Sequence, residues 1–334
     1  MQRIFSMTVA AALLTIGFIS TAAAEEVTVG ILKITVAAPV LIAQAKGYFA
    51  AEGLVVKPAF FDSANAIAIA TASGAVDFGT GGNSATLYNL AGQGALRIVA
   101  GAAHEAPGFH GQLVVASNRA YAAGLTSIKK LGDHSVSVGQ FGSPAHYSLS
   151  LIAEKVGLDL KTLRLTQMRG IAESVSAITG GQIDAAVLVG VPILPVINRD
   201  AAKLLGWISD EVTWQVGSVW TNTKTANNRR DMVERFLRAL RRGSQDYHNA
   251  FIGPDERRRD GPTASGVLGI MAEGLGLPGE QLRASISYLD AEGRLDVRDV
   301  QRQIAWYQRQ GFVKPGGDGN TIIDIRYVVP LPEK

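Results

Sequence analysis

The sequence contains no cysteine, and this absence excludes several kinds of chemistry at once. A chain without cysteine forms no disulfides, has no thiolate nucleophile and cannot ligate a metal through sulfur. The sequence also lacks a GxGxxG dinucleotide fingerprint, a phosphate-binding loop with lysine, an HExxH metal motif and a GxSxG nucleophile motif. We therefore expect no bound cofactor and no metal, and we expect a binding protein rather than an enzyme.

An excess of charge of one sign is also lacking, because 32 lysines and arginines face 29 aspartates and glutamates. This balance does not favour a nucleic-acid partner. Long apolar runs are missing except near the N-terminus, where Ile4–Ile19 lies between Arg3 and Ala22-Ala23-Ala24. The pattern predicts a signal peptide over residues 1–24, cleaved after Ala24. No cysteine follows the apolar run, so we expect a free periplasmic protein rather than a lipoprotein.

The stretch from Val27 to Phe61 has the pattern of a strand, a loop, a helix and a second strand. Val27–Ile31 is apolar and β-branched like a buried strand, and Pro39 stands where a helix favours proline, at its first residue. Leu54–Phe61 resumes as a strand, so the two strands need a crossover and are predicted to be parallel. In such a unit the loop after the first strand faces the ligand crevice. A loop without a ligand role is the alternative.

The helix of this unit resembles the opening of one protein family. Ala38–Phe49 reads APVLIAQAKGYF and is followed by Glu52-Gly53-Leu54. This run is similar to the substrate-binding proteins of ABC importers for nitrate, sulfonates, taurine and thiamine precursors, the NMT1/THI5-like family. Phe141–Tyr147 and Ile304–Val313 resemble later segments of the family, so the resemblance covers nearly the whole mature chain.

The resemblance implies an α/β fold of the periplasmic binding protein type II, with two α/β lobes and a ligand cleft between them. It implies a small-molecule ligand and, as partners, an inner-membrane ABC permease and its ATPase; we expect a monomer. Exceptional members of the family make a pyrimidine precursor with a cysteine-rich iron motif. That chemistry is excluded here because the chain has no cysteine. A periplasmic ligand sensor is an alternative function.

Two segments of the chain echo each other. Ala70–Asp77 reads ATASGAVD and Ala177–Asp184 reads AITGGQID, and each joins a helix end, a glycine, an aliphatic residue and an aspartate. The spacing is too long for a solenoid repeat, so the echo predicts two similar lobes with the same helix-to-strand turn; coincidence is the alternative. We place the first lobe at residues 25–110 and 217–334, and the second lobe at residues 111–216.

Three further segments have a predicted structure. Residues 75–79 are predicted to form a strand, followed by a glycine-rich turn over Gly79–Ser84 of the kind that binds anions through backbone N–H groups. Residues 229–250 have the apolar spacing of a long amphipathic helix. Another helix is predicted over residues 279–288.

Polar residues and glycines gather where the predicted strands end, which is where open α/β sheets bind ligands. The strongest candidates in the first lobe are Gly82, Asn83 and Ser84, and those in the second lobe are Ser143, Ala145 and His146. The other candidate ligand-binding residues are Lys33, Ile34, Thr35, Asn65, His104, His110, Arg169, Gly190, Val191 and Trp220. Structural alternatives stand beside them, such as a helix cap for Asn65, a surface position for Arg169 and a core position for Trp220.

The fold alone does not determine the ligand. Two helix starts that face one cleft favour an oxyanion, and Arg169 would add a charge-assisted bond if it pointed inward. Because aspartate and glutamate are scarce in these turns, we expect a sulfonate, a taurine-like molecule, a carboxylate or nitrate. A thiamine-precursor pyrimidine or another heterocycle is the alternative. On this interpretation, Ser143→Ala weakens binding and leaves stability nearly unchanged.

Overall fold

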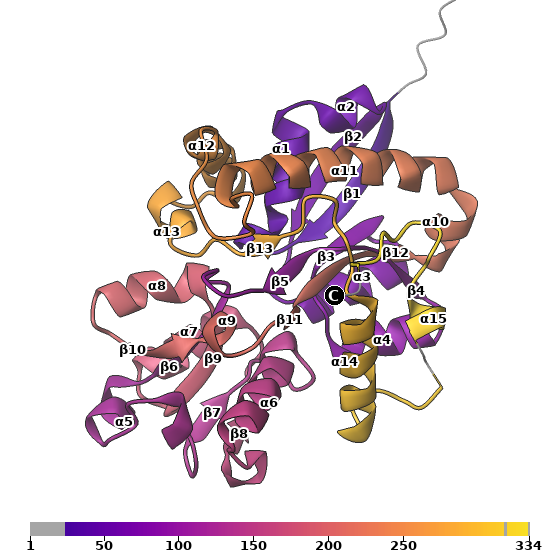
Figure 1. Cartoon of the computed structure of the whole chain (residues 1–334). Coiled ribbons are helices and arrows are strands. Elements are labelled where there is room, and N and C mark those ends of the chain that lie inside the picture. The colour runs from indigo at the N-terminus through magenta and orange to yellow at the C-terminus, as the bar shows by residue number, and fades with distance from the viewer. Residues whose placement is uncertain (1–23, 317–318, 333–334) are drawn as a thin grey trace, which may run out of the picture.

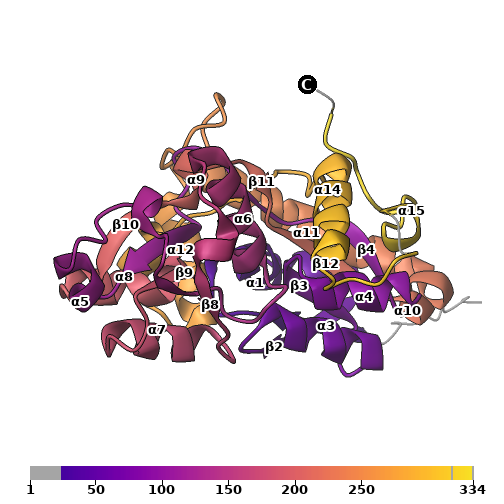
Figure 2. The same cartoon turned by 90° about the horizontal axis from the view of Figure 1, so that it is seen from below.

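The computed structural model describes residues 24–316 and 319–332, so the signal peptide predicted over residues 1–24 lies outside the described part except for Ala24. Two α/β lobes lie side by side and are joined by crossing strands (Figures 1 and 2). This arrangement confirms the predicted fold class. Within the described ranges, no helix has the length and apolar character needed to cross a membrane.

The first lobe is built on a five-stranded sheet in the order β2-β1-β3-β12-β4. Strand β1 is parallel to β2 and β3, whereas β12 is antiparallel to both of its neighbours. The predicted parallel pair is confirmed, with Val27 opposite Val56. The strands are β1 (Glu25–Ile31), β2 (Leu54–Phe60), β3 (Phe78–Gly82), β4 (Leu96–Gly101) and β12 (Gly217–Asn222).

Helices from both halves of the chain cover this sheet and share one apolar core. The long helix α11 buries Met232, Val233 and Phe236, and it confirms the amphipathic helix predicted over residues 229–250. The helices are η1 (Thr35–Ala37), α1 (Ala38–Ala45), α2 (Tyr48–Ala51), α3 (Ala64–Ser73), α4 (Ala85–Gly92), α10 (Thr223–Asn228), α11 (Arg230–Phe251), α12 (Ala264–Leu275), α13 (Gly279–Arg283), α14 (Val297–Arg309) and α15 (Gly319–Ile322).

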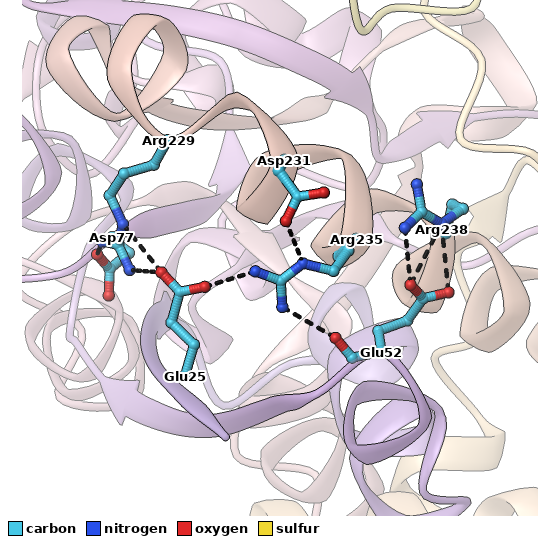
Figure 3. A network of polar contacts seen from close by, with 7 residues as sticks. All are labelled: Glu25, Glu52, Asp77, Arg229, Asp231, Arg235 and Arg238. Carbon is cyan, nitrogen blue, oxygen red and sulfur yellow. Dashed lines mark hydrogen bonds and ion pairs between the residues drawn. The ribbon is translucent and has the colours of Figure 1, made fainter. Parts of the chain in front are cut away.

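A polar network fastens the start of α11 to the N-terminal ends of β1, β2 and β3 in the first-lobe sheet (Figure 3). The Glu25 carboxylate accepts hydrogen bonds from Arg229 Nη2 at 2.7 Å and from Arg235 Nη2 at 2.6 Å. Arg229 also pairs with Asp77, and Arg238 pairs with Glu52. The Arg229 guanidinium holds the pKa of Glu25 below its usual value, so the ionised carboxylate is the form that ties β1 to α11.

The second lobe has its own five-stranded sheet in the order β10-β6-β9-β7-β8. Successive residues of β6 point to opposite faces, so Val114 and Ala116 join one core cluster and Leu113 and Val115 join another. The elements are β6 (Gln112–Ala116), α5 (Asn118–Ala122), η2 (Ile128–Lys130), β7 (Ser135–Ser137), α6 (Pro144–Val156), η3 (Leu160–Thr162), β8 (Arg164–Thr166), α7 (Ile171–Thr179), β9 (Ala185–Val189), α8 (Gly190–Asn198), β10 (Lys203–Trp207) and α9 (Ile208–Glu211).

A small third sheet, in the order β11-β5-β13, lies where the lobes meet. Strand β5 (Ala103–Glu105) leads toward the second lobe, and β11 (Trp214–Gln215) leads back to the first. Strand β5 lies in the middle of this sheet and pairs antiparallel with β11 on one side and with β13 (Tyr288–Leu289) on the other. The chain therefore crosses between the lobes here (Figure 1). The lobe limits at residues 110 and 216 remain a prediction.

The two echoing segments form equivalent turns. In the first lobe, Thr28 N donates to Asp77 Oδ2 at 2.9 Å, and Asp77 N donates back to Thr28 O. In the second lobe, Ser135 N donates to Asp184 Oδ2 at 2.9 Å, and Asp184 N donates back to Ser135 O. Each aspartate thus fixes its helix end to a strand of its own lobe, as the echo predicts.

Two predicted elements were wrong. The strand predicted over residues 75–79 is β3 (Phe78–Gly82), so the glycines assigned to an anion-binding turn belong to the sheet. Gly79 is needed for close packing, because a Cβ there would lie 2.4 Å from Trp220 Nε1. The helix predicted over residues 279–288 stops at Arg283, and Tyr288 pairs with His104 in the connecting sheet.

Candidate functional site

A cavity of about 140 Å³ lies between the two lobes. An engineered apolar protein cavity of about 150 Å³ is large enough to bind benzene. The first lobe contributes the loop after β1 and the start of α3, and the second lobe contributes the starts of α6 and α7. A molecule in this cavity would touch both lobes at once.

The helix starts at this cavity have different caps. Ser63 Oγ accepts from Ala66 N at 3.2 Å at the start of α3, and Ser143 Oγ accepts from His146 N at 3.3 Å at the start of α6. Gly170 precedes α7 without a side-chain cap. The first turn of any helix leaves N–H groups without intrahelical partners, and the helix dipole makes these ends partially positive. The starts of α3, α6 and α7 therefore suit an electron-rich group.

Direct contacts hold the lobes together around the cavity. Asn65 Nδ2 on α3 donates to Gln140 Oε1 in the second lobe at 2.6 Å, and both residues line the cavity. Ala85 N donates to Gly142 O at 2.8 Å, and the Tyr307 hydroxyl on α14 donates to Ser143 O at 3.0 Å. The structure is thus a closed arrangement of the two lobes.

The structure brings one group of the predicted site residues to this cavity. Those that line it are Ile34, Thr35, Asn65, Gly82, His104, Ser143, Ala145 and Val191. The Thr35 hydroxyl bonds to Ser285 O and Ser287 Oγ, which fixes the loop after β1 against the C-terminal part of the chain. Whether these residues contact a ligand remains a prediction.

The other predicted residues do not line this cavity. Asn83, Ser84 and Trp220 are buried in the first lobe, where Ser84 caps α4. Gly190 lies against Ser285, since a Cβ there would come within 2.4 Å of Ser285 Oγ. Lys33 is exposed, with its ammonium 5.2 Å from the centre of the Phe60 ring.

Arg169, His110 and His146 also lie away from the cavity wall. Arg169 is exposed and pairs with Glu173, so it takes the surface position that was its structural alternative. His110 stacks on Trp207 at 4.1 Å between ring centres. His146 packs against Trp306 and Phe312, and burial lowers its pKa to about 4.

Several lining residues were missed from the sequence, and they change the electrostatics of the site. Glu105, Gln112 and Gln140 line the cavity, as does Asp62. None of the described residues that line it is lysine or arginine. Aspartate and glutamate are absent from the turns at residues 82–84 and 143–146, but these turns are not the whole wall, and other segments bring Asp62 and Glu105 to the cavity. A lone acidic residue inside the apolar run around Glu105 was the available signal.

A model of the family described as NMT1/THI5 like matches residues 34–251, which is well over half of the chain. The chain belongs to the NMT1/THI5-like family. A comparison with curated protein sequences finds no match.

Solved structures similar to this NMT1/THI5-like chain share its fold. The alkanesulfonate-binding protein SsuA from Xanthomonas axonopodis pv. citri, bound to MOPS, has a TM-score of 0.71 at 17% identity, covering 91% of this chain and 99% of that one. The periplasmic nitrate-binding protein NrtA from Synechocystis PCC 6803 has a TM-score of 0.65 at 15% identity, covering 89% and 84%. The desulfurization enzyme DSZB has a TM-score of 0.63 at 12% identity, covering 92% and 96%. Identities this low establish the fold alone.

The described part of this family member holds no cluster of three or more histidine and acidic side chains suited to a metal ion. His104 and Glu105 are adjacent on β5, where His104 is half-buried and Glu105 is buried. Burial lowers the pKa of His104 and raises that of Glu105 well above its usual range. Without a charged partner, both side chains therefore favour their neutral forms.

Proposed function

We propose that this NMT1/THI5-like protein is a periplasmic solute-binding protein that delivers a small organic molecule to an inner-membrane ABC importer. The observation that carries the proposal is the cavity enclosed by both lobes, with helix starts from each lobe on its wall. A solute that touches both lobes stabilises their closed arrangement, because closure is favoured by any ligand that binds that state better. A permease and its ATPase would then distinguish the closed, loaded protein from the open one.

Binding without chemistry is the better supported use of this cavity. A serine nucleophile needs a base within hydrogen-bond reach. The Ser143 hydroxyl instead donates to Val138 O at 2.6 Å and accepts from the first turn of α6. The desulfurization enzyme DSZB has a similar fold, so this part of the proposal depends on the residues of the cavity and not on the fold.

The cavity supports a small polar solute with an electron-rich end. The starts of α3, α6 and α7 favour such an end through N–H groups and helix dipoles. A sulfonate, a taurine-like molecule or a carboxylate fits this requirement. With no lysine or arginine among the described lining residues, a bare inorganic anion such as nitrate receives less support.

A thermal-shift screen of sulfonates, carboxylates and heterocyclic amines tests the proposal. A solute present at about 100 times its Kd adds roughly 2.7 kcal/mol to the free energy of unfolding. We expect at least one class to raise the melting temperature in a saturable way, and mass spectrometry to recover that solute unchanged. Chemical conversion of the bound solute, or no stabilisation by any class, contradicts the proposal.

A further inference from the structure

Polar atoms on the cavity wall lack partners. Of the described side chains that line the cavity, those with a buried atom that makes no hydrogen bond are Asn65 (Oδ1), His104 (Nε2), Glu105 (Oε2) and Gln112 (Nε2). Buried polar atoms in folded proteins are nearly always paired, so an unpaired set on one cavity points to a ligand that completes it. Glu105 is the most informative member, since a carboxylate oxygen cannot be mistaken for an amide nitrogen.

The surroundings of Glu105 leave its carboxyl group facing the cavity. The residue is only 2% exposed, and it lies on β5, which pairs with β11 and β13. Gly111 borders it without a side chain: a Cβ there would lie 3.0 Å from Glu105 Oε1 and 3.4 Å from Ser287 Oγ. Because Gly111 has no side chain, there is room beside it for the Glu105 carboxyl group and the Ser287 hydroxyl group. Burial and the negative charge of Asp210 both disfavour an unpaired Glu105 carboxylate, and the Gln112 amides oppose this only in part.

We propose that Glu105 determines specificity by accepting a hydrogen bond from an N–H group of the solute at Oε2. The inference rests on the proposed function and narrows its ligand class. Asn65 Oδ1 is a second unpaired acceptor on the wall, and the Gln112 side-chain amide, whose Nε2 makes no hydrogen bond, lies beside the Glu105 carboxyl. An ammonium group, or an amino group on a heterocycle, supplies the donors that these oxygens require. Nitrate and plain alkanesulfonates offer only acceptors and leave them unpaired.

The solute therefore carries an electron-rich end for the helix starts and an N–H donor for Glu105. Calorimetric titrations of the full mature chain compare solutes that differ only by an amino group: taurine with ethanesulfonate, β-alanine with propionate, and aminopyrimidine with pyrimidine. The amino member of at least one pair is expected to bind about tenfold tighter or more, as for a hydrogen bond to a charged group. The first two pairs report an ammonium and the third a heterocyclic amine, so the pair that responds identifies the source of the N–H group.

Glu105→Met, which removes the acceptor at similar volume, is expected to bring that ratio close to one. Glu173→Met is the matched control, because Glu173 is exposed and pairs with Arg169 away from the cavity; the ratio stays at its wild-type value. A ratio that survives Glu105→Met overturns the inference. If that variant does not fold, the wild-type ratios decide, and equal binding within every pair overturns it.

The two proposals fail in different ways. If the best-binding solute of the broader screen has no N–H group, the role of Glu105 is wrong while the solute-binding function stands. If no solute stabilises the protein, the proposed function fails and this inference fails with it.

Discussion

At the scale of single residues, Ser143 has a structural role in addition to the ligand contact that remains a prediction. Its hydroxyl donates to Val138 O at 2.6 Å and accepts from His146 N, so it caps α6 and ties that helix to the strand before it. We expect Ser143→Ala to lower the free energy of unfolding by about 1 kcal/mol in urea denaturation. Ser84→Ala, which removes the cap of α4 outside the cavity, is the control for the loss of a helix cap alone. Unchanged stability of Ser143→Ala would agree with the sequence-based expectation and contradict this one.

His146 makes stability depend on pH. Burial lowers its pKa to about 4 from an ordinary value of 6.5, so the unfolded state binds more protons between these values. The stabilisation is complete above about pH 6.5 and is lost as the pH falls toward 4, amounting to about 3 kcal/mol at most. His146→Asn does not titrate and keeps an acceptor for the Gly142 N–H. Urea titrations at about pH 7 and pH 4.5 should show a smaller loss for this variant, and equal losses would exclude His146 as the cause.

At the scale of elements, Gly79 of β3 is required by packing. A Cβ at Gly79 would lie 2.4 Å from Trp220 Nε1 and 2.6 Å from Ile67 Cγ2. Gly79→Ala should therefore cost about 1–3 kcal/mol of stability. Gly269→Ala on α12 meets no atom within 4 Å and should stabilise the protein by about 0.5–1 kcal/mol. Melting temperatures from thermal unfolding distinguish the two variants. A Gly79→Ala variant as stable as the wild type would contradict the packing of β3 against Trp220 and favour the loop predicted from the sequence.

The network between β1 and α11 gives a second prediction for an element. Glu25 bonds to Arg229, just before α11, and to Arg235 on α11, whereas the neighbouring Glu26 pairs with Lys57 at the surface. Glu25→Gln should lower the free energy of unfolding by up to about 1 kcal/mol at neutral pH, and Glu26→Gln should leave it unchanged. Because the pKa of Glu25 is lowered, the difference between the two variants should vanish in acid, as the carboxylate is protonated. Equal effects at neutral pH would contradict the role of the network.

Sequence patterns predicted the elements whose periodicity is long or repeated. The apolar stripe of α11 extends along the whole helix. The same helix-to-strand connection occurs twice in the chain, once at Asp77 and once at Asp184. The limits of β3 could not be predicted, because the packing of Trp220 against Gly79 joins residues far apart in the sequence. Part of the cavity wall was predicted from the sequence, because residues shortly after a strand, such as Ile34 and Thr35, line the cavity. Glu105 was missed because the connecting sheet that places it has strands of only two or three residues. Gln112 was missed because it begins β6, where the strand pattern alone does not show which strand end reaches the cavity.

At the scale of the whole molecule, two lobes with the same turn enclose one cavity, and bonds such as Asn65 to Gln140 close it from both sides. The central claim is that this cavity binds the solute. A crystal structure of the protein with the best-stabilising solute of the screen tests it most directly. The account predicts electron density for the solute between the lobes, beside Glu105 and the starts of α3 and α6. Density for the solute on the outer surface of either lobe, with none in the cavity, would contradict it.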